Sequence, residues 1–300
     1  MKILVTGASG LLGSKIVELA AKAGYDVFSG YFANPPKSGH PLRIDVGSEA
    51  SISKAIAETK PNAIIHCAAL TDVDRCEVEK DLAKKINVEG TELVAKAAMR
   101  EDAYLVFIST DYVFDGSKGM YREDDETGPI NFYGKSKLLG EKALEKINGN
   151  LLIARTSALY GDRPASGKPN FALWIMESLK NGKAVKILTD QFVSPALNTN
   201  LAEMILEACE KRLNGVYHMS GASRVSRYEF AVRIAEVFKL KKTLIKKAEM
   251  SDLGWVAKRP KDSSLDVSKA QKALRTKPMS LNESLNILKG EIEFASRNSS

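Results

Sequence analysis

The chain has 300 residues, of which 44% are hydrophobic and 27% charged, and its formal net charge is +7. This composition is typical of a globular protein with one large domain or two smaller ones, and every apolar run is far shorter than the ~20 residues that cross a membrane. The basic excess lacks aromatic interleaving or a nucleic-acid motif, so we expect a solvated surface rather than a nucleic-acid site.

Cysteine and histidine usage argues against two further kinds of site. The three cysteines lack CxxC spacing and the three histidines stand apart, so we expect free thiols and no metal centre. From Met1 the chain runs directly into a strand and a glycine motif, which leaves no room for a signal peptide. We therefore expect a cytoplasmic protein without a membrane segment.

The chain begins with a predicted strand, a glycine turn and a helix. Lys2–Thr6 is a β-rich run, and GASGLLG follows at residues 7–13. Gly7 permits a tight turn, Gly10 lets the backbone approach a pyrophosphate, and Gly13 lets the helix pack on the strand. The free N–H groups and positive dipole of the helix N-terminus favour phosphates. The pattern predicts a dinucleotide-binding turn, with a purely structural turn as the alternative.

The end of the second predicted strand, Asp26–Tyr31, bears on the choice of cofactor. An acidic residue there would hydrogen-bond the adenosine ribose 2′-hydroxyl of NAD, but the chain continues Phe32-Ala33-Asn34. The missing acid argues against strict NAD use and leaves room for a 2′-phosphate, although no arginine stands there to bind it. Residues 42–46 form a third predicted strand, in which Asp45 either meets the adenine or caps the next helix.

Strand and helix continue to alternate through the first half of the chain. The remaining predicted elements are a helix at 48–59, a strand at 62–69, a helix at 81–100, a strand at 103–109, a helix at 131–147 and a strand at 151–155. This alternation predicts an α/β fold with a doubly wound parallel sheet, Rossmann-like, and we assign a dinucleotide-binding domain to residues 1–155.

Beyond residue 155 the pattern is looser. It predicts helices at 171–180, 198–213 and 226–238, a strand at 215–219, a mobile loop at 163–169 and a disordered tail at 297–300. We assign residues 156–296 to a smaller substrate-binding region that is interleaved with the first domain.

Tyr133 and Lys137 are the candidate catalytic pair. Their spacing of four places both side chains on one face of the predicted helix. A free phenol titrates near pH ~10, and a nearby ammonium should lower that pKa toward the working range. Thr110, at the carboxyl end of a buried strand, would hold a substrate oxygen beside the phenol. Because Tyr-x-x-x-Lys is common by chance, the assignment depends on the surrounding motifs.

Several motifs in order resemble one family over essentially the whole chain. They are GASGLLG at 7–13, AALTDVDRCE at 68–77, ISTDYVFDG at 108–116, YGKSKLLGE at 133–141, DQFVSPA at 190–196, GVYHMSG at 215–221, RYEFA at 227–231 and RPKDSSLD at 259–266. The chain resembles the extended short-chain dehydrogenase/reductase family, and is most similar to its dTDP-4-dehydrorhamnose reductase branch. The resemblance implies NADPH-dependent reduction, with NADH as the alternative cofactor, of the C4 ketone of dTDP-4-dehydro-L-rhamnose to dTDP-L-rhamnose, and allows a homodimer.

The resemblance also implies a role for each matching residue. Tyr133 would donate the proton, Lys137 would bind the nicotinamide ribose, and Thr110 would hydrogen-bond the substrate oxygen. The implied cofactor-binding residues are Gly7, Ser9, Gly10, Leu11, Leu12, Gly13, Asp45, Val46, Ala68, Ala69, Tyr133 and Lys137. The implied substrate-binding residues are Val73, Asp74, Asp111, Asn170 and Arg259.

Two alternatives remain open at the level of sequence. A nucleotide-sugar dehydratase or epimerase would retain NAD, but the family's dehydratases carry Asp-Glu after the threonine, whereas Tyr112 follows Asp111 here. A regulatory subunit like that of methionine adenosyltransferase would bind the cofactor without turnover, but Tyr133 and Lys137 are intact. The branch often has tryptophan where this chain has Ala158-Leu159 and Arg227, which concerns the choice of sugar rather than the hydride chemistry.

Overall fold

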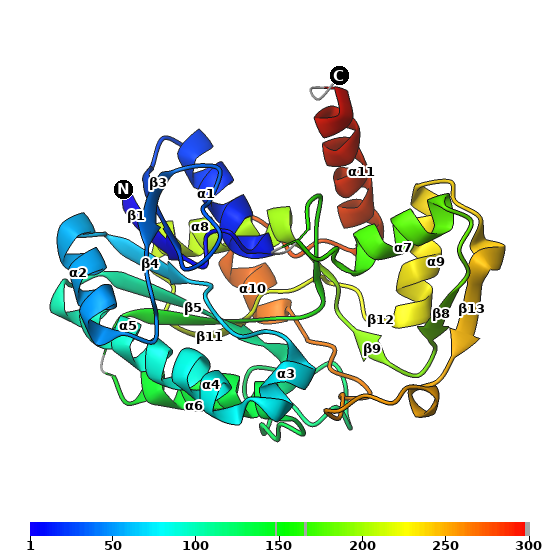
Figure 1. Cartoon of the computed structure of the whole chain (residues 1–300), viewed down its shortest axis with the longest axis horizontal. Helices are drawn as coiled ribbons and strands as arrows, with labels where there is room; N and C mark the ends of the chain where they lie inside the picture. The colour runs from blue at the N-terminus through cyan, green and yellow to red at the C-terminus, as the bar shows by residue number, and fades with distance from the viewer. Residues whose placement is uncertain (148, 165–166, 298–300) are drawn as a thin grey trace.

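A computed structural model describes residues 1–147, 149–164 and 167–297 and has an α/β fold (Figure 1). The loop expected at 163–169 and the tail expected at 297–300 lie partly outside these ranges, so both expectations stay predictions. The central sheet has seven parallel strands in the order β11-β6-β5-β4-β1-β2-β3. The predicted doubly wound parallel sheet is confirmed.

A strand of this sheet lies at or near each of the predicted strand positions. Their bounds are β1 Lys2–Thr6, β2 Asp26–Tyr31, β3 His40–Arg43, β4 Ala63–His66, β5 Tyr104–Thr110, β6 Leu151–Thr156 and β11 Gly215–His218. Strands β1, β4, β5 and β6 are almost wholly buried, because helices cover both faces of the sheet. The third strand ends earlier than predicted, which leaves Asp45 in the loop that follows it.

Two helical layers enclose the sheet (Figure 1). Helices α1 (Leu11–Lys22) and α8 (Asn198–Lys211) pack together, and their apolar side chains share a core with one sheet face. Helices α2 (Glu49–Thr59), α5 (Gly90–Arg100) and α6 (Phe132–Glu145) cover the other face. The parallel strands therefore have their carboxyl ends free along one edge, where open α/β sheets bind ligands.

The helix predicted at 81–100 is interrupted. It consists of α4 (Lys80–Lys84), a π-helical segment η1 (Lys85–Glu89) and α5. Asn87 in η1 is fully buried, and its amide bonds both the N–H and the carbonyl of Leu70 and donates to Ser136 Oγ at 2.9 Å. These long-range contacts favour the wider turn, as is common near functional sites. The short helix α3 (Val73–Val78) was not predicted.

The second half of the chain adds a separate apolar core. It joins α7 (Phe171–Lys180), α9 (Arg227–Val237) and α11 (Leu281–Arg297) to the strand pair β8 and β13. The remaining elements are β7 Leu159–Tyr160, β8 Val185–Leu188, β9 Phe192–Val193, β10 Ala196–Leu197, β12 Val225–Ser226, β13 Ile245–Ala248, α10 Ser268–Ala273, and the one-turn helices η2 Asp111–Val113, η3 Lys242–Leu244 and η4 Met250–Asp252. Strand β11 and helix α8 lie after residue 155 in the chain but belong to the sheet and core of the first half. The division of the chain into two domains at residue 155 stays a prediction.

The described residues contain neither a membrane-spanning helix nor a cluster of metal-binding side chains. None of the helices in the described ranges combines the length and the apolar character that a bilayer crossing requires. Within the same ranges, no group of three or more histidine, cysteine, aspartate or glutamate side chains is arranged to hold a metal ion.

Candidate active site

A cavity of about 730 Å³ opens along the carboxyl edge of the sheet. Its walls include residues that directly end or follow β1, β2, β4, β5 and β6. The lining residues are Thr6, Gly7, Ser9, Gly10, Leu11, Leu12, Gly13, Gly30, Tyr31, Phe32, Ala33, Asn34, Ile44, Asp45, Val46, Gly47, Cys67, Ala68, Ala69, Thr71, Leu82, Lys85, Ile86, Ile108, Ser109, Thr110, Asp111, Tyr133, Lys137, Thr156, Ala158 and Leu159. The strand order reverses between β1 and β4, so the cavity lies at the switch point of the sheet.

The glycine turn forms one end of the cavity. Gly10 is the N-cap of α1 and no side chain caps this helix, so its first N–H groups remain available to a ligand. Gly7 has φ +67°, and a Cβ added there would lie 2.8 Å from the Ala68 nitrogen. A Cβ on Gly13 would overlap the Gly7 carbonyl oxygen. Gly7 and Gly13 thus let the turn pack closely on Ala68 and on itself, and the uncapped N–H groups of α1 fit a pyrophosphate.

The residues predicted to meet the adenosine lie in the adjoining wall of the cavity. The residues after β2, including Phe32 and Asn34, lie in the same cavity as Asp45. Asp45 does not cap α2: Ser48 Oγ accepts the N–H of Ser51, while Asp45 Oδ1 accepts the N–H of Gly47 at 2.9 Å. The candidate cofactor residues Val46, Ala68 and Ala69 line the cavity too.

Several residues that line the cavity were not predicted from the sequence. Thr6 and Thr156 end strands of the sheet, a signal that could have found them, whereas Lys85 is brought in by the π-helical segment.

The three candidate catalytic residues line the same cavity as the turn. Thr110 ends β5, while Tyr133 and Lys137 lie one turn apart on α6, whose N-cap Asn131 accepts the Gly134 N–H at 2.8 Å. The Tyr133 and Thr110 side chains line the same cavity. Lys137 Nζ lies 4.0 Å from the centre of the Phe107 ring, over its face. In this arrangement Tyr133 can donate a proton to an oxygen atom that is held beside it.

The protonation of this pair differs from the sequence-based expectation. Burial raises the pKa of Tyr133 well above its ordinary value, and the neighbouring Thr110 side chain, which lowers it, only partly opposes this effect. Burial also lowers the pKa of Lys137 to about 7, against the charge of Glu141, which raises it. Burial is thus the largest influence on both groups. At neutral pH Tyr133 is a neutral phenol, the form that can donate a proton.

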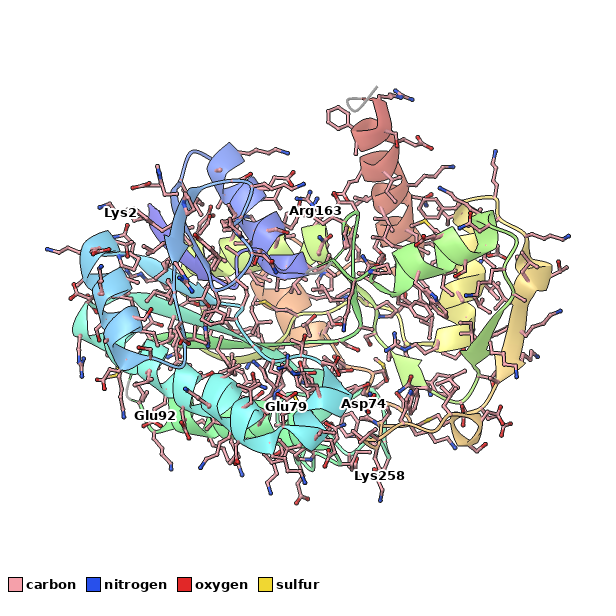
Figure 2. All side chains as sticks on the ribbon, in the orientation of Figure 1. Lys2, Asp74, Glu79, Glu92, Arg163 and Lys258 are labelled. Carbon is pink, nitrogen blue, oxygen red and sulfur yellow. The ribbon has the colours of Figure 1, made fainter. Side chains whose placement is uncertain are left out.

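Most candidate substrate residues lie outside the cavity wall. Asp111 lines it, but Asp74 and Arg259 form an ion pair with each other, with Arg259 Nη2 2.9 Å from Asp74 Oδ2. Asp74, labelled in Figure 2, also accepts the N–H of Ala257 at 2.9 Å. The pair therefore ties α3 to the segment before residue 260.

Val73 and Asn170 are not among the lining residues either. Val73 is the first residue of α3, and Asn170 Oδ1 caps α7 by accepting the N–H of Ala172 at 3.1 Å. Its Nδ2 donates to the carbonyls of Gly161 and Arg163. The substrate role of these residues stays a prediction.

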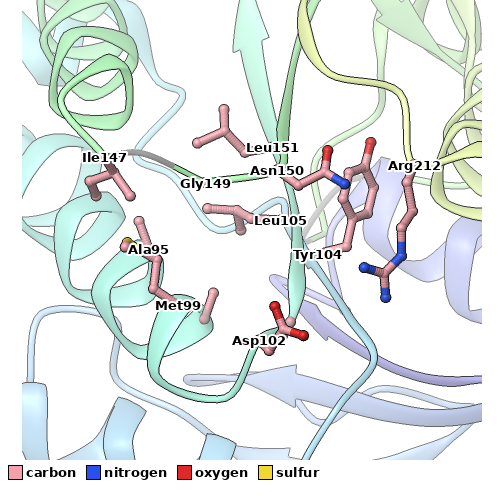
Figure 3. Close-up of a pocket in the computed structure, with 12 residues that line it drawn as sticks. Ala95, Met99, Asp102, Tyr104, Leu105, Ile147, Gly149, Asn150, Leu151 and Arg212 are labelled. Carbon is pink, nitrogen blue, oxygen red and sulfur yellow. The ribbon is translucent and has the colours of Figure 1, made fainter.

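A second, smaller cavity lies at the opposite edge of the sheet (Figure 3). It measures about 200 Å³ and is bordered by the amino ends of β5 and β6, with Asp102, Tyr104 and Arg212 among its lining residues. The Tyr104 hydroxyl donates to the Leu213 carbonyl at 2.5 Å, so it is already paired. This cavity is separate from the glycine turn and contains none of the candidate catalytic residues.

Similarity to known proteins identifies the family of this chain. A family model described as the RmlD substrate binding domain matches residues 1–291. The chain belongs to this family. The predicted membership in the extended short-chain dehydrogenase/reductases, close to the dTDP-4-dehydrorhamnose reductases, is confirmed.

Three known proteins are similar to this chain over most of their length. A protein of Haloferax volcanii named "Probable low-salt glycan biosynthesis reductase Agl14" is 37% identical, with 96% of this chain and 97% of that protein covered. A Bacillus anthracis dTDP-4-dehydrorhamnose reductase, solved in complex with NADP, is 32% identical at a TM-score of 0.87, with 97% and 99% covered. Methionine adenosyltransferase 2 subunit beta of Xenopus tropicalis is 31% identical, with 90% and 82% covered. Through this family the chain is an NAD(P)-dependent oxidoreductase, as predicted.

Proposed function

We propose that the chain is a sugar-nucleotide reductase that uses NADPH, or NADH as the alternative, to reduce the C4 ketone of dTDP-4-dehydro-L-rhamnose to dTDP-L-rhamnose. The observation that carries the proposal is the shared cavity of Thr110, Tyr133 and Lys137 with an uncapped glycine turn. The named reductases among the relatives support the substrate class. The homodimer and the cytoplasmic location stay predictions.

The residues divide the work of a carbonyl reduction. NADPH supplies the hydride when it is bound. Tyr133, as a neutral phenol, gives its proton to the ketone oxygen, and Thr110 fixes the position of that oxygen. Lys137, which lines the same cavity, would hold the nicotinamide ribose. Hydrogen bonds in this buried wall stabilise the developing alkoxide more than they would in water.

Two other functions have weaker support. A dehydratase needs a second acid after Asp111, but that position is Tyr112, whose ring meets the Tyr133 ring edge-on at 6.0 Å. A regulatory subunit, as in the methionine adenosyltransferase relative, would not need a complete set of Thr110, Tyr133 and Lys137. The reductase is therefore favoured over both.

Product analysis tests the proposal directly. We expect one alcohol formed per reduced cofactor consumed when the protein is incubated with NADPH and dTDP-4-dehydro-L-rhamnose. The measurement is loss of nicotinamide absorbance together with mass and stereochemical identification of the sugar, over a panel of 4-keto-6-deoxy nucleotide sugars. Turnover of a dTDP-hexose without net cofactor oxidation would instead identify a dehydratase or epimerase, and binding without any turnover a regulatory subunit.

Cofactor preference gives an independent prediction. Because no acid ends β2, we expect NADPH to bind at least as tightly as NADH in a fluorescence titration. Phe32→Asp places a carboxylate at this wall and should shift the preference toward NADH. The matched control is Phe294→Asp, since Phe294 is similarly exposed on the distant helix α11. Strong discrimination by the unaltered protein against NADPH would contradict this prediction and favour an NAD-retaining enzyme.

A further inference from the structure

Asp111 is a buried carboxyl group surrounded by hydroxyls. It follows Thr110 at the end of β5 and is 3% exposed. Thr110 Oγ1 lies 3.0 Å from Asp111 Oδ1, while Ser157 Oγ and Ser263 Oγ lie 2.7 and 2.5 Å from Oδ2. Ser157 follows β6 and Ser263 belongs to the segment before α10, so three distant parts of the chain meet at this group. Within the described ranges, no lysine or arginine forms an ion pair with Asp111.

The surroundings of Asp111 favour its neutral form. Burial raises the pKa of Asp111 above the usual range of an aspartate, while the hydroxyls of Ser263, Ser157 and Thr110 and the more distant charge of Arg227 on α9 lower it. The other titratable groups that face Asp111 are the hydroxyls of Tyr112 in η2 and Tyr133 on α6. Burial raises the pKa of both hydroxyls. Asp111 therefore keeps its proton to a higher pH than an exposed aspartate.

The single hydroxyl proton of Thr110 links this group to the reaction. Thr110 Oγ1 accepts the N–H of Tyr112 at 3.2 Å and donates to Asp111 Oδ1 at 3.0 Å, and Thr110 lines the same cavity as Tyr133. When Asp111 is ionised it can only accept, so the Thr110 proton points to Asp111. A ketone oxygen can only accept too, and it then finds no donor on Thr110. When Asp111 is protonated, its O–H donates to Thr110 Oγ1, and the Thr110 proton is free for the ketone.

We propose that Asp111 is a positioning residue whose neutral carboxyl turns the Thr110 hydroxyl toward the substrate ketone. In this role Asp111 does not bind the sugar itself, because Thr110, Ser157 and Ser263 occupy its oxygens. Thr110 becomes a second donor beside Tyr133, and two donors stabilise the developing alkoxide more than one. No proton of Asp111 is consumed, since Tyr133 supplies the one that the ketone gains. The inference rests on the proposed reduction.

Asp111→Asn separates this role from that of an essential carboxylate. The amide keeps the shape of the side chain, donates permanently to Thr110 through Nδ2, and still accepts from the two serines. We expect kcat/KM of Asp111→Asn to stay within about threefold of the unaltered enzyme at low pH. The unaltered enzyme should lose about tenfold per pH unit above the pKa of Asp111, and the variant should lack this limb. Asp115→Asn, an exposed change in the same loop, should leave the profile unaltered.

A second readout does not depend on turnover. Infrared spectroscopy should detect a protonated carboxyl band that Asp111→Asn removes and that disappears with rising pH at the midpoint of the activity limb. Two results would overturn the inference: an alkaline limb that persists in Asp111→Asn, or a loss of activity as large as in Thr110→Ala at every pH with an unchanged thermal midpoint. If the unaltered protein reduces no 4-keto sugar, the proposed function fails, and absence of the infrared band at neutral pH overturns the inference separately.

Discussion

Replacing Tyr133 with phenylalanine is expected to lower turnover by about 10²-fold or more while cofactor binding is retained. The change removes a hydroxyl and leaves the ring, which packs against Tyr112. Since burial raises the pKa of Tyr133, the unaltered residue is a neutral donor at pH 7, and its replacement leaves the ketone oxygen without that proton. Steady-state rates and NADPH titration of the same preparation measure the two effects separately.

Tyr25→Phe is the matched control for this experiment. The Tyr25 hydroxyl contacts Glu210 on the surface, away from the cavity, so its loss should not alter turnover. A Tyr133→Phe variant that turns over as fast as this control would remove Tyr133 from the mechanism.

The second large effect is expected on stability, and it concerns a buried ion pair between the catalytic helix α6 and strand β6. Glu141 on α6 is fully buried and Arg155 on β6 is 4% exposed. The Arg155 guanidinium contacts both carboxylate oxygens, with Nη2 2.7 Å from Oε2 and Nε 3.0 Å from Oε1, and Ser109 also donates to Oε1. Glu141→Gln leaves the guanidinium charge without its partner, so we expect the free energy of unfolding to fall by about 3–5 kcal/mol. Urea-induced unfolding measures the change.

The control for this prediction is an exposed pair. Glu92 lies 2.6 Å from Lys96 on the outer face of α5 and is labelled in Figure 2. Glu92→Gln should cost at most about 0.5 kcal/mol, because water screens the charges. A double change of Glu141 to Leu and Arg155 to Met should cost less than the sum of the single changes, since no charge is left alone. Equal costs for Glu141→Gln and Glu92→Gln would show that the buried pair contributes little.

Features that depend on neighbouring residues were predictable from the sequence. Strands β1, β4 and β5 are mainly apolar runs, the glycine turn follows the first of them directly, and Tyr133 and Lys137 share a helix face because they are four residues apart. Thr110 could be placed at the sheet edge because it ends a buried strand. These predictions need only the local periodicity of the chain.

Features that depend on distant residues were not predictable. Asn87 in the π-helical segment contacts Ser136, and the Asp74–Arg259 pair joins residues far apart in the chain. The pKa of Tyr133 was expected to be lowered by its neighbouring lysine, but burial in the folded protein raises it. Burial is a property of the whole packed chain, and one lysine at helical spacing says nothing about it.

The position of β11 has a consequence for synthesis of the chain on the ribosome. Strand β6 pairs with β5 on one side and with β11, at residues 215–218, on the other, and α8 covers α1. Translation adds roughly 5–20 residues per second, so the ~60 residues between β6 and β11 take about 3–12 s. Throughout that time the nascent chain exposes an unpaired, apolar sheet edge. This interval is when aggregation competes with folding and when a ribosome-bound chaperone would be most effective.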